Sequence, residues 1–170
     1  MARTDNPITF LRSEYTAPAF LIHRVDLDIA LNPARTIVVN RMQIKRNTSN
    51  EALPLVLHGE EQELVSVRVN GEVITEYDLT PQSLTLKNLP DVFELSITSA
   101  CAPEKNTSLM GLYVSNGNFF TQCEAEGFRK ISYFLDRPDV MATYQVTLRA
   151  LKAQFPVLLS NGNLIKEEEL

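Results

Sequence analysis

The sequence predicts an all-β protein, a saddle-like β-sandwich of curved antiparallel and mixed sheets with little helix. Three observations support this fold class. Apolar and polar residues alternate with a period of two through most of the chain, as they do in half-buried strands. Turn signals recur about every 8–12 residues, which is typical of sandwiches. Asn-Gly pairs at 70–71 and 116–117 each separate two alternating runs, and this is the strongest short signal for a hairpin.

The first strand is expected over 20–31, where Val25, Leu27 and Ile29 alternate with polar neighbours. A turn at 32–35, containing a proline, ends it. The remaining strand signals lie, in order, at 36–46, 53–57, 63–69, 72–75, 83–87, 92–98, 111–115, 118–123 and 144–150.

Two local details are also predicted. Strict alternation over 63–69 places Val65, Val67 and Val69 on one face of their strand. Helix is scarce, because 124–135 has no clean amphipathic period, and Pro138 is expected to begin only a short helical turn through 142.

The chain has 170 residues, which suits one domain, expected over 1–163, with a charged tail or truncated linker at 164–170. Its net charge of −5 and the lack of a basic stripe argue against a nucleic-acid partner. Nothing in the sequence resembles a signal peptide, and no apolar run is long enough to cross a bilayer. We therefore expect a cytoplasmic protein without a membrane span, in which Cys101 and Cys123 are reduced thiols.

No metal site and no catalytic residue are expected from this chain alone. Its two histidines, His23 and His58, do not form the helical His-Glu-x-x-His arrangement, and its two cysteines do not form a Cys-x-x-Cys pair. Cys123 adjoins Glu124, whose charge would disfavour a thiolate. An alternation with a period of two points the Cys123 side chain to the face opposite that of Gln122 and Glu124. We therefore interpret Cys123 as a small buried core residue.

Gln122 and Glu124 are the candidate binding residues. In an extended strand, positions two apart point to the same face, so an amide and a carboxylate could receive one small cation there. An ammonium group would suit them, because it carries a charge and several N–H donors. The alternative is a solvated strand face whose carboxylate pairs with Arg129 or Lys130.

At this segment the chain resembles the M1 family of zinc aminopeptidases, and within it the bacterial branch typified by aminopeptidase N. The matching residues are Gly111-Leu112-Tyr113, Thr121-Gln122-x-Glu124-Ala125, Arg129, Asp136-x-Pro138 and Ala142-x-Tyr144. The runs 123–129, 133–140 and 158–163 are similar to the bacterial branch, and the likeness is clear from about 109 to 163.

The resemblance implies an N-terminal β-sandwich domain that rests against a zinc-dependent catalytic domain absent from this chain. It implies that Gln122 and Glu124 anchor the free amino terminus of a peptide, and that the parent is a hydrolase that removes N-terminal amino acids. The zinc ligands of the family are not in this sequence, so the fragment alone is expected to be inactive. The alternative function is a stand-alone β-sandwich module that binds a protein partner.

Overall fold

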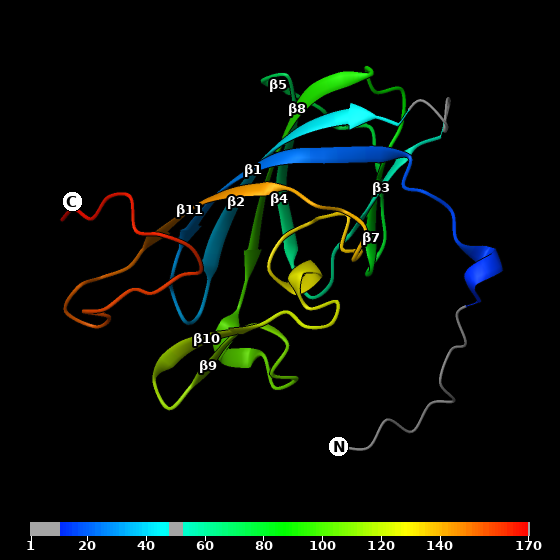
Figure 1. Ribbon diagram of the computed structural model, residues 1–170. Coiled ribbons are helices and arrows are strands. Elements are labelled where there is room, and N and C mark those ends of the chain that lie inside the picture. Colours follow the sequence, from blue (N-terminus) through cyan, green and yellow to red (C-terminus); the bar gives the residue numbers. More distant parts are fainter. Residues whose placement is uncertain (1–10, 48–52, 170) are drawn as a thin grey trace.

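The computed structural model describes residues 11–47 and 53–169, and Figure 1 shows their arrangement. The strands are β1 (Phe20–Ala30), β2 (Thr36–Arg46), β3 (Leu55–His58), β4 (Glu63–Val69), β5 (Glu72–Val73), β6 (Asp78–Leu79), β7 (Ser83–Leu86), β8 (Val92–Cys101), β9 (Gly111–Ser115), β10 (Asn118–Gln122) and β11 (Thr143–Arg149). There are also three short 3₁₀ helices: η1 (Arg12–Glu14) precedes β1, η2 (Pro103–Lys105) lies between β8 and β9, and η3 (Phe128–Lys130) lies between β10 and β11. The described residues contain no α-helix.

The largest sheet has six strands in the order β11-β1-β2-β8-β4-β5. All neighbours are antiparallel except β1 and β11, which run parallel from the pair Arg24 and Thr143 to the pair Ala30 and Arg149. A strand from the last fifth of the chain therefore forms one edge of the sheet, as Figure 1 shows. The prediction of an all-β fold with antiparallel and mixed sheets is confirmed.

Alternation places the apolar side chains of the long strands on one face. In β1, Val25, Leu27 and Ile29 are buried, whereas Asp26 and Asp28 are only partly covered. Burying such branched side chains on a pleated face contributes roughly 1.5–3 kcal/mol each, and this is what selects the strand register.

A β-bulge corrects the prediction for 63–69. The pairing with β8 shifts between Leu64 and Ser66, so Val65 is the extra residue of the bulge. Val67 is 1 % exposed as expected, but Val65 is 50 % exposed, and Leu64 packs against the core in its place. A second shift lies in β1 between Ile22 and Arg24.

Two smaller sheets complete the molecule. The three-stranded sheet β3-β7-β6 supplies four leucines to the core. The β9–β10 hairpin forms the third sheet and lies at the bottom of the view in Figure 1. The Asn-Gly hairpins at 70–71 and 116–117 are confirmed. The largest fully buried side chains are Phe20, Ile22, Val25, Val38, Met42, Ile44, Leu55, Leu57, Leu84, Leu86, Leu95 and Ile97.

The segments around β11 are irregular. The prediction of a helical turn from Pro138 through 142 is wrong. Pro138 and Asp139 form a single turn instead, in which the Val140 N–H donates to the Arg137 carbonyl at 3.2 Å. Residues 150–169 contain no strand, and the proposed boundary after 163 stays a prediction. In the described part of the chain, no helix has the length and hydropathy needed to span a membrane.

Candidate functional site

The two candidate residues do not share a strand. β10 ends at Gln122, and Glu124 lies in the turn that follows, so the prediction of a common strand face is wrong. The chain folds back at this point because the Gly127 N–H donates to the Cys123 carbonyl at 2.8 Å, and the Glu124–Ala125 peptide within the turn is cis. Gln122 and Glu124 nevertheless remain joined, since Nε2 of Gln122 donates to the main-chain oxygen of Glu124 at 2.8 Å.

Gly127 makes this turn possible. A Cβ atom at this position would lie 2.4 Å from the Gln122 carbonyl oxygen and 2.8 Å from the Cys123 Cα. Both are backbone atoms, which cannot move without displacing the end of β10. Only glycine therefore allows the turn to lie so close to the strand.

Arg129 and Asp136 fasten the segment that follows the turn. The Asp136 carboxylate accepts hydrogen bonds from Nε of Arg129 at 2.9 Å and from its main-chain N–H at 3.1 Å, and the Arg129 guanidinium also donates to the Asp136 carbonyl at 3.0 Å. Both side chains are only 15 % exposed. Such a partly buried, multiply hydrogen-bonded pair is far more constraining than a surface ion pair.

The basic side chains next to the turn are thus engaged elsewhere. Arg129 pairs with Asp136 and Glu126, and Lys130 pairs with Glu61 at 2.8 Å. The predicted alternative, a surface pair between Glu124 and either of them, is not formed. Within residues 11–47 and 53–169, the Glu124 carboxylate has no ion-pair partner, and the residue is exposed. A carboxylate in this state is available to a cation from outside.

Two polar residues of the sheets hold the segment in place. The fully buried Asn40 of β2 donates to Oγ of Ser132 at 2.8 Å and to the Tyr133 carbonyl at 3.3 Å. His58 of β3 forms a two-way main-chain bridge with Phe134, and its Nδ1 accepts the Asp136 N–H at 3.2 Å. Burial, and then the positive charge of Arg129, lower the pKa of His58, which favours the neutral imidazole that this bond requires.

Neither histidine is suited to bind zinc. Nδ1 of His58 already accepts a hydrogen bond, and His23 is exposed on β1, in a different sheet. Across the described ranges, no group of three or more His, Cys, Asp or Glu side chains could hold a metal ion. The described residues therefore do not fit a zinc site.

Both cysteines are free thiols. Cys123 packs against the core, as predicted, and burial raises the pKa of its thiol, with Asp136 adding to the effect. Burial raises the pKa of Cys101 to about 11. Neither thiol is activated as a nucleophile.

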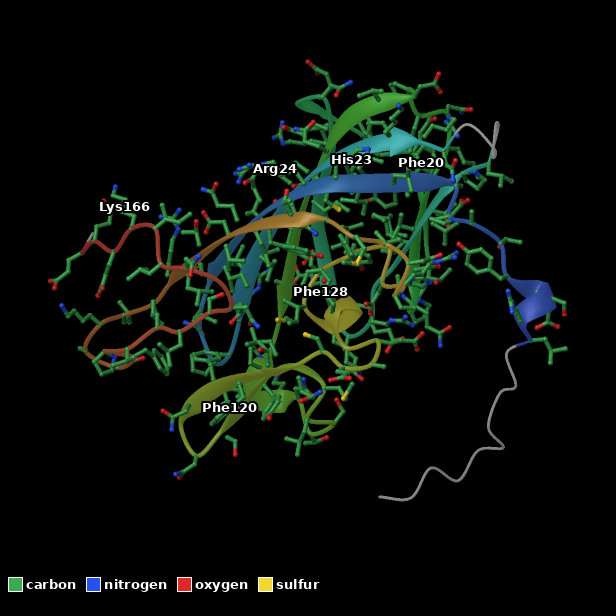
Figure 2. The ribbon with its side chains drawn as sticks, viewed as in Figure 1. Phe20, His23, Arg24, Phe120, Phe128 and Lys166 are labelled. Atoms are coloured by element: carbon green, nitrogen blue, oxygen red, sulfur yellow. The ribbon has the colours of Figure 1, made fainter. Side chains whose placement is uncertain are left out.

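Aromatic rings cover the inner side of the turn. Phe128, labelled in Figure 2, packs edge-on against Phe134 with ring centroids 5.1 Å apart and against Tyr144 of β11 at 6.2 Å. Residues quoted from the matching motif, Arg129, Asp136 and Tyr144, thus all support the turn that carries Glu124. Asn40 and His58 were not predicted to contribute, because each lies more than 70 residues away in the sequence from the group it contacts.

Comparison with known proteins identifies the family. The profile of the peptidase M1 N-terminal domain matches residues 21–170. The chain belongs to this family. This M1 N-terminal domain is 42 % identical over 167 residues to aminopeptidase N of Escherichia coli and 43 % identical over 162 residues to aminopeptidase N of Haemophilus influenzae. These matches cover 98 % and 94 % of this chain but only 19 % and 18 % of the relatives.

Solved structures agree. Legionella pneumophila aminopeptidase A, solved in complex with aspartic acid, matches this M1 N-terminal domain with a TM-score of 0.85 and 38 % identity, over 93 % of this chain and 19 % of that one. An M1 zinc metallopeptidase from Deinococcus radiodurans shares the fold, with a TM-score of 0.64 at 18 % identity over 78 % of this chain and 32 % of that one. The predicted family is confirmed. The role of Gln122 and Glu124 stays a prediction.

Proposed function

We propose that this M1 N-terminal domain anchors the free amino terminus of a peptide for a zinc-dependent aminopeptidase, through Gln122 and Glu124. The observation that carries the proposal is the unpaired, exposed carboxylate of Glu124 on a turn that is otherwise fixed by hydrogen bonds. The main-chain oxygen of Glu124 already binds Nε2 of Gln122, which leaves Oε1 of Gln122 as a neutral acceptor beside the charged one.

The chemistry matches an α-ammonium group. Such a group has three N–H donors and one positive charge, and it needs acceptors of which at least one is anionic. A charge-assisted hydrogen bond of this kind contributes roughly 1.5–3 kcal/mol. A peptide blocked at its amino terminus loses the charge and most of the donors, so this site would favour exopeptidase substrates.

The chain's part in the reaction would be positioning. A fixed anchor for the ammonium group places the first peptide bond at a set distance from a catalytic centre, and correct positioning contributes to rate through orientation. The zinc-dependent chemistry would belong to a catalytic domain outside this chain. We therefore expect the 170-residue chain to bind no stoichiometric zinc and to cleave no aminoacyl anilide.

The relatives support this assignment over a stand-alone interaction module. They are aminopeptidases, and the chain spans about a fifth of their length. Exposed apolar side chains from β11 onwards would suit a contact with a catalytic domain. They are Tyr144, Val146, Leu151, Val157, Leu158, Leu159, Leu164 and Ile165. The free thiols support our further proposal of a cytoplasmic location.

Kinetics in the full-length protein would test the anchor. Glu124→Gln keeps the shape of the side chain and removes its charge, and we expect kcat/KM for an alanyl anilide to fall about 10- to 100-fold. Glu126→Gln is the matched control, because Glu126 lies in the same turn, is mostly exposed and pairs with Arg129. Equal, near-wild-type kinetics for both variants would refute the assignment of Glu124.

A further inference from the structure

The loop after β3 holds the segment that supports the proposed anchor. The Arg129 carbonyl accepts hydrogen bonds from the Glu60 N–H at 2.9 Å and from Nε2 of Gln62 at 2.6 Å. The Glu60 carboxylate also lies 3.9 Å from the Arg129 guanidinium and 3.7 Å from Nζ of Lys130. These contacts fix η3 against the end of β3.

His58 is the last residue of β3, and its imidazole contacts the same segment. Its Nδ1 accepts the main-chain N–H of Asp136 at 3.2 Å. A main-chain N–H can only donate, so this hydrogen bond exists only while Nδ1 carries no proton. When the imidazole is protonated, the bond is lost and two N–H donors face each other.

Asp136 connects His58 to the turn that carries Glu124. The Asp136 carboxylate accepts hydrogen bonds from Nε of Arg129 at 2.9 Å and from its main-chain N–H at 3.1 Å. The Arg129 guanidinium in turn lies 3.4 Å from the carboxylate of Glu126, which belongs to the turn. His58 is therefore linked to the turn through two residues that hold each other by several hydrogen bonds.

Charged groups on the elements packed against His58 act on its protonation in both directions. Two carboxylates favour the protonated imidazole, and two guanidiniums oppose it. They belong to Asp136, Glu126, Arg129 and Arg137. Ser83, the partner of His58 on β7, is uncharged. Burial has the largest effect, followed by Arg129, and the two lower the pKa of His58. The imidazole is therefore neutral near pH 7 and gains its proton only below about pH 6.5.

We propose that His58 is a positioning residue for the ammonium anchor, and that acidification weakens the anchor by protonating its imidazole. The inference rests on the proposed function, because it takes Gln122 and Glu124 to bind the ammonium group. Protonation breaks the hydrogen bond to Asp136 and places a cation beside the carboxylate that holds Arg129. Loss of one hydrogen bond of this kind changes a binding equilibrium by about two- to tenfold.

Binding of alaninamide to the 170-residue chain, followed by ¹H–¹⁵N NMR, tests the proposal. The α-amino group of this ligand is largely charged at both about pH 7 and about pH 5. Over this range wild type should lose about two- to tenfold more affinity than His58→Asn, which keeps an acceptor but does not titrate. His58→Leu removes the acceptor and should bind about two- to tenfold more weakly than His58→Asn at both pH values. His23→Gln, which alters the exposed histidine of β1, should behave like wild type.

The outcomes separate this proposal from the anchor itself. If alaninamide shifts the signals of Gln122 and Glu124, but wild type and His58→Asn lose affinity equally on acidification, the role of His58 is wrong and the anchor stands. That comparison decides even if His58→Leu does not fold. If alaninamide shifts neither signal at neutral pH, the anchor is wrong and the role of His58 falls with it. Acid-induced changes in β8 as large as those at Arg129 would show a general effect on the fold and would also overturn the proposal.

Discussion

The six-stranded sheet and the segment 122–137 are held in place by different kinds of interaction. The sheet depends on alternating apolar side chains, such as Val38, Met42 and Leu95, all of which are 0 % exposed. The segment 122–137 has little regular structure and depends on individual polar contacts and close backbone packing. The sheet therefore stabilises the fold as a whole. The polar contacts of the segment 122–137 fix the turn that carries Glu124.

The largest expected effect concerns the sheet. Leu95→Ala should lower the free energy of unfolding by about 2–5 kcal/mol, because a fully buried leucine of the central strand β8 is replaced by a cavity. Urea denaturation would measure this. The control Val92→Ala lies in the same strand at 65 % exposure and should change the free energy by no more than about 0.5 kcal/mol. Similar losses for both would mean that the sheet is not packed as described.

Gly127→Ala tests the close approach of the turn. The added methyl group meets the Gln122 carbonyl oxygen, and relieving this overlap should cost about 1–3 kcal/mol of unfolding free energy. The amide signals of Gln122 and Glu124 should shift, while those of β2 and β8 should not. A variant with wild-type stability and unchanged signals would contradict the account of the turn.

Asp136→Asn should have an effect of similar size that is confined to the segment 122–137. It removes the anionic charge closest to the partly buried Arg129 guanidinium and leaves only the longer pairs with Glu126 and Glu60, at a cost of about 1–3 kcal/mol of unfolding free energy. Hydrogen exchange should accelerate at 124–130 more than in β8. The matched control, Glu63→Gln, breaks the exposed pair with Arg35 and should cost less than about 1 kcal/mol. Equal effects of the two would remove the distinction between the two regions.

The smallest expected effect is a pH dependence. Burial lowers the pKa of His58 in the folded protein, so the unfolded chain binds this proton more readily near pH 6.5. The stability that the neutral imidazole contributes is therefore complete above pH 6.5 and is lost as the pH falls through the lowered pKa. Urea denaturation between pH 7.5 and 5 should show this loss. His58→Asn keeps an acceptor and should remove the dependence, whereas the exposed His23→Gln should retain it.

The same comparison explains what the sequence could predict. Local alternation located β1, β2, β4 and the two Asn-Gly hairpins to within a residue or two, because burial of one strand face acts over neighbouring residues. It could not predict the bulge at Val65, which depends on the register with β8. It also could not predict the parallel pairing of β11 with β1, whose partners are more than 100 residues apart.

For the candidate site, the role of the two predicted residues stays a prediction, and the predicted geometry is wrong. The types of Gln122 and Glu124 and the surrounding motif indicated an ammonium anchor, and the period-two pattern wrongly extended β10 through Cys123. The turn depends on Gly127, on the Arg129–Asp136 pair and on contacts from Asn40 and His58. Contacts between residues so distant in sequence leave no periodic signal in a single chain.

Direct binding of alaninamide to the 170-residue chain tests the central claim, that the fixed turn presents the Glu124 carboxylate to an ammonium group. We expect alaninamide to shift the NMR signals of Gln122 and Glu124, and N-acetylalaninamide to shift neither. Glu124→Gln should weaken alaninamide binding about 10-fold or more, and Glu126→Gln should bind like wild type. Equal binding of the two compounds, or undiminished binding by Glu124→Gln, would contradict the claim.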